Sequence, residues 1–304
     1  MFDLGIVIVN WNTCDRLREC LRSVYASHGQ FTFQVYVVDN ASTDGSAAMV
    51  HAEFPQAQVI ESPTNAGYPA GNNLGLRAFG FGPGLTNGPR YALLLNPDTV
   101  LPETALAAML AYMNARPRCG VAGPKLVLPN GELDLACRRS FPTPEVSFYR
   151  MIGLSRLFPH SPRFGRYNLT YLSPDMETEV DSVVGAFMLV RREAIAQAGL
   201  MDEAFFMYGE DLDWAFAIKQ AGWEVRYNPA VTVLHVKRAA SRLSRRAQIA
   251  FEVSMLIFYH KHYAASTPPL LGALVVLGIR LKLAGTLLRE RFARRHRPLT
   301  AAET

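Results

Sequence analysis

The 304-residue sequence is poor in cysteine: it has four, and no two of them form a C-x-x-C pair. A zinc knuckle or a thioredoxin-like redox motif is therefore not expected. A disulfide framework of the kind found in small secreted proteins is also disfavoured, because four cysteines are few for a chain of this length. The cysteine content thus predicts a protein of a reducing, intracellular compartment.

Other marks of specialised chains are missing as well. Glycine (22) and proline (19) are close to ordinary usage and no internal repeat is found, which excludes collagen-like and low-complexity chains. No basic segment precedes the first apolar run, residues 4–9, and this run is too short for the apolar part of a signal peptide. The length of the chain suits two domains or one large α/β domain with an appendage. Hydrophobic residues make up 49% of the chain, which is enough for a sizeable core.

Positive charge is scarce in most of the chain and concentrated at its end. Residues 1–236 hold 18 lysines and arginines against 23 aspartates and glutamates, whereas residues 237–304 hold 13 against 3. A mildly acidic body lacks the basic face of a nucleic-acid-binding domain, so no nucleic-acid partner is expected. The basic end predicts an arm that binds an anionic surface such as a membrane leaflet.

The first part of the chain alternates between strand and helix patterns. Apolar runs predict strands at residues 4–9, 35–38, 59–60 and 91–95. Helical spacing of apolar residues predicts helices at residues 15–26, 46–54, 70–79 and 102–114. The alternation predicts an α/β fold with a mostly parallel central sheet flanked by helices. Ligands of such sheets bind beyond the carboxyl ends of the strands.

The pattern is weaker further along. Residues 119–181 show no clear period, and no regular structure is predicted for residues 140–178. After this region we expect strands at residues 183–190, 225–227 and 231–234, and helices at residues 191–198 and 210–220.

Two helices, at residues 239–263 and 268–292, are predicted for the C-terminal part. Residues 270–288 are mostly apolar, but they include Arg280 and Lys282, each of which costs about 2.5–3.5 kcal/mol at the centre of a bilayer. Five arginines follow: Arg289, Arg291, Arg294, Arg295 and Arg297. A helix lying in the membrane interface is therefore preferred over a spanning helix, and a helix packed on the body is the alternative.

Polar residues follow the predicted strand ends. Asp39 closes the second strand, where a carboxylate can accept a hydrogen bond from the imide N–H of uracil or thymine, while Asp44 lies where a helix N-cap is also expected. Residues 65–73 hold glycines and amides that suit a loop over a nucleotide, or an ordinary start of a helix. Asn96-Pro97-Asp98 ends the fourth strand with one carboxylate, which suits a Mg²⁺ or Mn²⁺ site and equally a turn.

Two further motifs lie in the second half. Glu210, Asp211 and Asp213 open a predicted helix, where the helix dipole stabilises carboxylates and capping is the simpler explanation. Crowded carboxylates also raise one another's pKa, as a general base requires. His235 ends the last predicted strand, although a lone histidine is more often a core or surface residue than a ligand.

Taken in order, these motifs resemble an inverting GT-A glycosyltransferase of family 2, of the rhamnosyltransferase-like type, over residues 3–263. The resemblance implies that Asp39 binds the base, that Asp98 and His235 bind Mg²⁺ or Mn²⁺, and that Asp211 is the general base, with Glu210 as the second candidate. Asn96 replaces the first aspartate of the family's DxD motif, which leaves one carboxylate. The expected donor-binding residues are Asn10, Asp39, Asn40, Asp44, Gly67, Asn72, Asn73, Asn96, Asp98 and Gly185.

The resemblance also implies a domain organisation. Residues 1–238 would form the catalytic domain, with a nucleotide-sugar half at residues 1–118 and an acceptor half at residues 119–238. Residues 239–304 would form C-terminal helices with a basic, membrane-associating tail. Asp181 and residues 185–187 are expected to line the donor-sugar or acceptor site, and Asp98 and Asp211 are expected to meet at one crevice.

The predicted activity is transfer of a sugar, with dTDP-rhamnose as the expected donor, to a hydroxyl of a lipid-linked saccharide or polysaccharide in cell-surface glycan synthesis. The protein would act in the cytoplasm, peripherally bound to the inner face of the cell membrane. Two alternatives stay open. A sugar-nucleotide-forming nucleotidyltransferase would need a glycine-rich, basic loop that residues 10–13 do not provide, and a non-catalytic adaptor would have no need of Asp39, Asp98 and Asp211.

Overall fold

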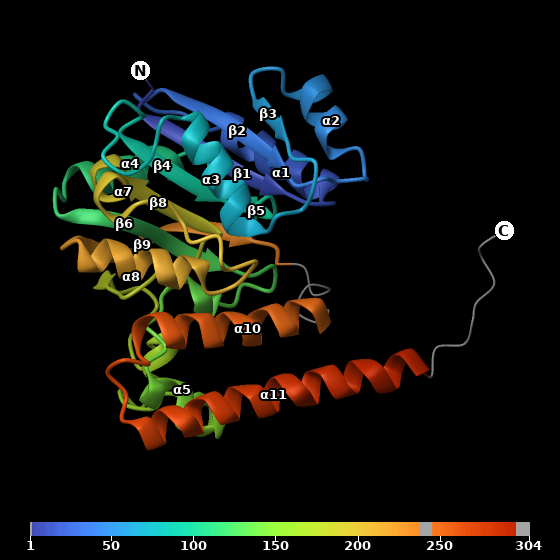
Figure 1. Ribbon diagram of the computed structural model, residues 1–304. Helices are drawn as coiled ribbons and strands as arrows, with labels where there is room; N and C mark the ends of the chain where they lie inside the picture. Colours follow the sequence, from blue (N-terminus) through green and yellow to red (C-terminus); the bar gives the residue numbers. More distant parts are fainter. Residues whose placement is uncertain (1, 238–244, 296–304) are drawn as a thin grey trace. The chain divides into compact units, whose positions relative to one another are not determined.

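The computed structural model describes residues 2–237 and 245–295, with side chains for residues 2–237 and 248–287 (Figure 1). They form two compact units. The first contains residues 2–206 and 210–237, and the second contains residues 207–209 and 245–295.

One mixed sheet forms the centre of the first unit. Within the described residues it has nine strands, and eight of them follow one another in the order β3-β2-β1-β4-β8-β6-β9-β5, with β7 paired to β9. The strands are β1 (Leu4–Asn10), β2 (Phe33–Asp39), β3 (Gln58–Glu61), β4 (Tyr91–Leu95), β5 (Thr99–Val100), β6 (Cys119–Val127), β7 (Thr178–Glu179), β8 (Phe187–Arg191) and β9 (Glu224–His235).

The predicted parallel arrangement is confirmed for β1 to β4, which pair in parallel throughout. All seven residues of β1 and all five of β4 are buried, as expected for parallel strands covered on both faces. Their carboxyl ends therefore lie at one edge of the sheet, where β1 ends at Asn10 beside Asp39 of β2.

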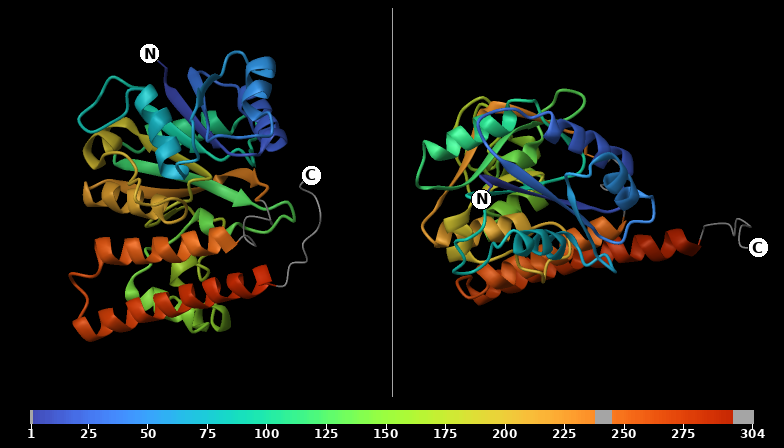
Figure 2. Two further views of the ribbon diagram at one scale, coloured as in Figure 1. Left: turned by 45° about the vertical axis from the view of Figure 1, so that its right-hand side comes forward. Right: turned by 90° about the horizontal axis from the view of Figure 1, so that it is seen from above.

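Helices cover both faces of this sheet. The helices of the first unit are α1 (Cys14–Tyr25), α2 (Ser46–Glu53), α3 (Tyr68–Ala78), α4 (Ala105–Asn114), α5 (Pro144–Met151), α6 (Leu154–Leu157), α7 (Arg192–Ala198) and α8 (Glu210–Gln220), and 3-10 turns lie at Leu135–Cys137 and Arg166–Asn168. Figure 2 shows α1 and α4 on one face and α3 and α8 on the other. Apolar residues of α1 at helical spacing, such as Leu17, Leu21 and Val24, are fully buried.

The sheet changes direction at β8. This strand lies between β4 and β6 and is antiparallel to both. Its first residues, which follow Val184, Gly185 and Ala186, therefore begin at the edge where the parallel strands end. The antiparallel insertion brings residues from the second half of the chain to the ligand-binding edge.

Strand β6 was not predicted from the sequence. Its Gly120, Gly123 and Pro124 weaken the strand pattern. The structure shows why glycine is needed: an added Cβ would lie 2.6 Å from Trp223 at position 120 and 2.7 Å from Val183 at position 123. Tertiary packing, rather than local preference, makes this segment a central strand.

The second unit contains the two predicted C-terminal helices, α10 (Arg245–His262) and α11 (Pro269–Arg295). Thr286 of α11 donates a hydrogen bond to Glu252 of α10 at 3.1 Å, and the Lys282 ammonium lies 5.5 Å from the centre of the Phe251 ring. Residues 239–244, which the prediction included in the first helix, lie outside the described residues, as do Arg297 and the side chains of Arg289, Arg291, Arg294 and Arg295.

Candidate active site

Asp39 is the buried carboxylate at the end of β2, with 4% of its surface exposed. Its Oδ1 accepts a hydrogen bond from Asn10 Nδ2 at 3.0 Å, and its Oδ2 accepts one from the Ser42 amide at 2.9 Å. Asn10 Nδ2 also donates to Ser42 Oγ at 3.1 Å. These bonds fix the carboxylate, and each of its oxygens keeps a second lone pair with which it can accept from a ligand.

Asp44 is used as a cap by two helices. It accepts from the amide of Cys14, the first residue of α1, at 2.8 Å and from the amide of Ser46, the first residue of α2, at 3.2 Å. Partial burial acts to raise the pKa of Asp44, but its hydrogen bonds with Ser46 and Cys14 hold it below its usual value. Capping accounts for this side chain, and its predicted role toward the donor stays a prediction.

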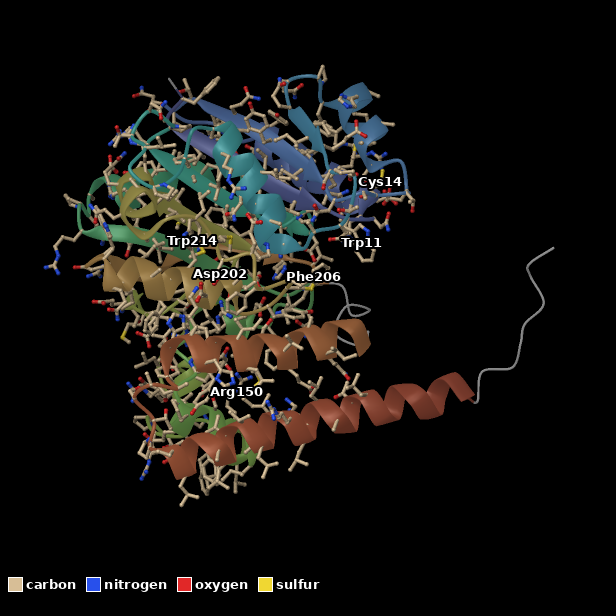
Figure 3. All side chains as sticks on the ribbon, viewed as in Figure 1. Trp11, Cys14, Arg150, Asp202, Phe206 and Trp214 are labelled. Atoms are coloured by element: carbon tan, nitrogen blue, oxygen red, sulfur yellow. The ribbon has the colours of Figure 1, made fainter. Side chains whose placement is uncertain are left out.

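The loop before α3 is packed tightly against Phe206. The amide of Tyr68 donates to the Phe206 carbonyl at 2.8 Å, and a Cβ added at Gly67 would lie 2.4 Å from that oxygen. Gly67 also has a positive φ of 96° and accepts from Asn40 Nδ2 at 3.0 Å. Figure 3 shows Phe206 near this loop and Trp11, which is 47% exposed, beyond the end of β1.

The two amides of α3 make internal bonds. Asn73 is bonded to both backbone groups of Met201 and to Glu203, so it fastens α3 to the loop that precedes α8. Asn72 is fully buried and donates to the Tyr68 carbonyl at 2.9 Å, while its Oδ1 has no partner within the described part of the chain.

Hydrogen bonds join both the turn that contains Asp98 and the first residues of α8 to residues 184–186. The Asn96 amide donates to the Ala186 carbonyl at 3.0 Å, and the Gly185 amide donates to Asp211 Oδ2 at 3.1 Å. Tyr68 donates to the Gly185 carbonyl at 2.8 Å. Burial raises the pKa of Tyr68, and so do the charges of Glu210, Asp211 and Asp98. The motifs that end β4 and open α8 thus flank residues 184–186.

His235 lies between two carboxylates. Its Nδ1 is 2.8 Å from buried Asp134 and its Nε2 is 3.4 Å from Asp98 Oδ1. Burial acts to lower the pKa of His235, but Asp134 and Asp98 together raise it above its usual value. The Lys237 ammonium also pairs with Asp134, at 2.7 Å. The pairing of β5 with β9 holds Asp98 in place, since the Val236 amide donates to the Asp98 carbonyl at 2.8 Å.

Asp98 and His235 fit a divalent cation. One or two carboxylates together with substrate phosphates typically hold Mg²⁺ or Mn²⁺. A histidine whose other ring nitrogen bonds a carboxylate, as Nδ1 bonds Asp134, is a common metal ligand. No group of three or more potential ligands is found among the described residues, so phosphate and water would complete the coordination.

Asp211 forms a buried ion pair with Arg139. The Arg139 Nη2 lies 2.7 Å from Asp211 Oδ2 and also donates to the Val183 carbonyl at 2.8 Å. The side chains are only 9% and 7% exposed. Asp211 Oδ1 accepts from its own helix, at the Leu212 amide. The carboxylate is thereby held in one orientation beside Gly185.

Glu210 differs from Asp211 in its protonation. Burial, and next the charge of Asp211, raise its pKa to about 8, so that it is mostly protonated at neutral pH. Its Oε2 has no partner within the described residues. Asp213, one turn further along, is 3% exposed.

The pKa of Glu210 predicts a pH-dependent stability. Between its usual value of 4.5 and about 8 the folded state holds a proton that the unfolded chain has released, so stability should fall as the pH rises through this range. The other charged or titratable groups that face Glu210 are Asp211, Asp213, Arg139 and Tyr68. Glu210→Gln should lose this slope, and urea unfolding between about pH 5 and pH 8 measures it. Parallel profiles for the two proteins would contradict the prediction.

Several residues of this site were not predicted from the sequence. Arg139, Asp134 and Lys237 lie in segments without a motif, and Tyr68 was seen only as part of a loop. Arg139 belongs to a pair of adjacent cations, Arg138-Arg139, but the same pattern occurs at Arg191-Arg192 and is therefore not specific. Nothing in the sequence indicated that Arg139 pairs with a residue 72 positions away.

Comparison with known proteins identifies the family of this chain. The model of the family described as "Glycosyltransferase like family 2" matches residues 3–250. This chain is a member of that family. The predicted resemblance is thus confirmed, and the protein is a glycosyltransferase.

Relatives of this family 2 glycosyltransferase include two rhamnosyltransferases. The N-acetylglucosaminyl-diphospho-decaprenol L-rhamnosyltransferase of Mycobacterium tuberculosis is 28% identical over 237 residues, which cover 77% of this chain and 76% of the relative. Rhamnosyltransferase WbbL of Escherichia coli is 30% identical over 152 residues, which cover 48% and 52%. The mannosyltransferase PcManGT of Pyrobaculum calidifontis, solved with GDP-Man and Mn²⁺, has a TM-score of 0.57 at 15% identity and covers 98% of this chain and 76% of its own. This likeness confirms the predicted GT-A fold.

Proposed function

We propose that this glycosyltransferase moves rhamnose from a dTDP donor to a hydroxyl of a lipid-linked saccharide, with inversion at the anomeric carbon, in the synthesis of a cell-surface glycan. The name of the mycobacterial relative supports both the sugar and the diphospho-lipid acceptor. The observation that carries the proposal is that residues 184–186 bond both Asp211 and Asn96, which lies two residues before Asp98.

On the donor side, Asp39 would accept a hydrogen bond from the imide N–H of the base, with Asn10 and Ser42 holding the carboxylate in place. Asp98 and His235 would hold Mg²⁺ or Mn²⁺, which neutralises the charge of the departing diphosphate. Asp134 orients the His235 ring through Nδ1 and leaves Nε2 directed at Asp98.

On the acceptor side, inversion requires one displacement, during which the attacking hydroxyl loses its proton. Asp211 is the proposed general base, because it carries the negative charge of its pair with Arg139. Glu210 is less suited, since a carboxyl with a pKa of about 8 is mostly protonated at neutral pH and cannot accept the proton of the attacking hydroxyl.

A panel of nucleotide sugars tests the proposed function. With Mg²⁺ or Mn²⁺ and no acceptor, dTDP-rhamnose should be hydrolysed slowly, and more quickly than UDP-sugars or GDP-mannose. A chelator should stop the reaction. If none of the nucleotide sugars is hydrolysed with either cation, the proposal is wrong.

We further propose that α11 binds the membrane surface, which would place the enzyme on the cytoplasmic face of the cell membrane. Residues 269–287 are long and apolar enough to span a bilayer, and only 6% of them are buried. Leu270, Leu274, Leu277 and Leu281 are 52–77% exposed and recur at helical spacing. The exposed cations Arg280 and Lys282 favour a helix that lies in the interface.

Replacing Leu274 and Leu281 by glutamate should release the protein from vesicles that contain anionic lipid. Both side chains are exposed, so the fold should tolerate the change. Leu85→Glu, at another exposed leucine (46%), is the matched control and should bind the vesicles as wild type does. Unchanged co-sedimentation of the double variant would contradict the proposed surface.

A further inference from the structure

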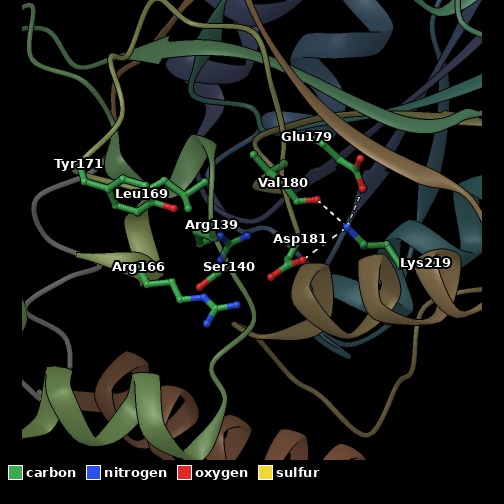
Figure 4. Close-up of a pocket in the computed structure, with 9 residues that line it drawn as sticks. All are labelled: Arg139, Ser140, Arg166, Leu169, Tyr171, Glu179, Val180, Asp181 and Lys219. Carbon is green, nitrogen blue, oxygen red and sulfur yellow. Dashed lines mark hydrogen bonds and ion pairs between the residues drawn. The ribbon is translucent and has the colours of Figure 1, made fainter. Parts of the chain in front are cut away.

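A pocket of about 270 Å³ lies in the first unit, in the half expected to bind the acceptor (Figure 4). On one wall, Lys219 is paired with Glu179 at 3.1 Å and with Asp181 at 3.4 Å. The opposite side is formed by Arg139, Ser140 and Arg166. Lys219 thus pairs with both acids, and Asp181 also accepts a hydrogen bond from the Phe141 amide at 3.0 Å, while the other side presents hydrogen-bond donors.

Two of these donors are buried and unused. Arg139 Nε and Ser140 Oγ have no hydrogen-bond partner within the described residues, although the two residues are only 7% and 5% exposed. A buried donor without a partner costs free energy that a ligand would recover. Arg166 is exposed at the entrance and extends its guanidinium toward the same pocket (Figure 4). Two guanidiniums and a hydroxyl that converge in this way suit phosphate oxygens better than neutral hydroxyls.

Arg139 joins the pocket to the proposed active site. Arg139 lines the pocket and its Nη2 is bonded to Asp211. A ligand phosphate in the pocket would thus lie on the far side of Arg139 from the proposed base. The donor diphosphate, in contrast, is expected at Asp98, so the pocket is suited to the acceptor.

An exposed apolar surface precedes Arg166 in the sequence. Five large apolar side chains of the segment that contains α5 and α6 are 47–70% exposed: Phe148, Met151, Ile152, Leu157 and Phe158. Residues 144–166, which include α5 and α6, contain the cations Arg150, Arg156, Arg163 and Arg166 and one acidic residue, Glu145. Exposed apolar groups with surrounding cations fit an anionic lipid surface.

We propose that this pocket binds the phosphate of a lipid diphosphate, with the apolar surface of residues 148–158 against the lipid. The inference rests on the proposed function, because it assigns a place to the diphosphate of the acceptor. Arg139 and Ser140 hold the phosphate inside the pocket, and Arg166 closes on it from the entrance.

The test measures binding without donor, metal or turnover. Farnesyl diphosphate is titrated into the full-length protein in a chelator, beside farnesol and inorganic pyrophosphate. Arg166→Gln and Ser140→Ala should each lower the affinity for farnesyl diphosphate about 5–10-fold. Arg118→Gln, at an exposed arginine outside the pocket, is the control and should bind as wild type does. Farnesol should not bind.

Ser140→Ala separates a ligand role from a structural one. Its hydroxyl has no partner in the described part of the protein, so its removal should leave the unfolding free energy unchanged or higher. Wild-type affinity in both Arg166→Gln and Ser140→Ala would overturn the proposal. Equal affinity for pyrophosphate and farnesyl diphosphate would overturn its lipid part. Slow hydrolysis of the donor by the wild-type protein tests the proposed function separately.

Discussion

Asp211→Asn is expected to reduce sugar transfer by about 10²–10⁴-fold, because the attacking hydroxyl would lose the group that takes its proton. Binding of the donor should change little, since Asp211 contacts Gly185 and Arg139 and none of the residues expected to bind the nucleobase of the donor. Transfer is measured with the acceptor, and donor binding is measured separately by calorimetry with Mn²⁺.

The variant needs a control for stability. An uncharged residue 211 leaves Arg139 buried without its counter-charge, which typically costs about 3–5 kcal/mol. Circular dichroism and urea unfolding would show whether enough folded protein remains. Glu210→Gln is the matched variant: it resembles the protonated side chain and should keep transfer within several-fold of wild type at neutral pH. If Asp211→Asn retains turnover, or if only Glu210→Gln loses it, Glu210 is the general base.

Asp98→Asn is expected to lower transfer by at least about 100-fold and to abolish the stimulation by Mn²⁺. Asn96 replaces the other carboxylate of the usual motif, so no second carboxylate in this turn can take over. The variant also removes the 3.4 Å contact with His235 Nε2. The measurement is a Mn²⁺ titration of donor hydrolysis.

Asp44→Asn is the control for this result. Asp44 lies at the same edge of the sheet, but its carboxylate caps α1 and α2. The loss of a cap should cost about 1 kcal/mol of stability and leave the Mn²⁺ requirement as it is. If Asp98→Asn responds to Mn²⁺ as wild type does, Asp98 is not a metal ligand.

The sequence predicted the parallel half of the fold well, because strands such as β1 and β4 are buried on both faces and appear as unbroken apolar runs. It also placed Asp39 at the end of β2 and Asp98 in the turn that follows β4. These features depend on local patterns, which a single sequence contains.

Contacts between distant parts of the chain were not predictable in the same way. The bond from Tyr68 to Gly185 spans 117 residues, and the bond from His235 to Asp134 spans 101. The glycines of β6 resemble a loop until Trp223 and Val183 are seen to fill the space beside them. Such pairings arise from the packing of the sheet and leave no periodic trace.

The antiparallel course of β8 has a consequence for exchanging parts between related enzymes. Residues 184–186 come from the second half of the sequence, yet their backbone groups bond Asn96 and Tyr68 of the first half as well as Asp211. A chimaera joined near residue 118 would therefore carry a foreign segment against its own nucleotide-sugar half. Hybrids that also transplant the tripeptide Val184-Gly185-Ala186 together with that half should recover activity more often than those divided at one crossover.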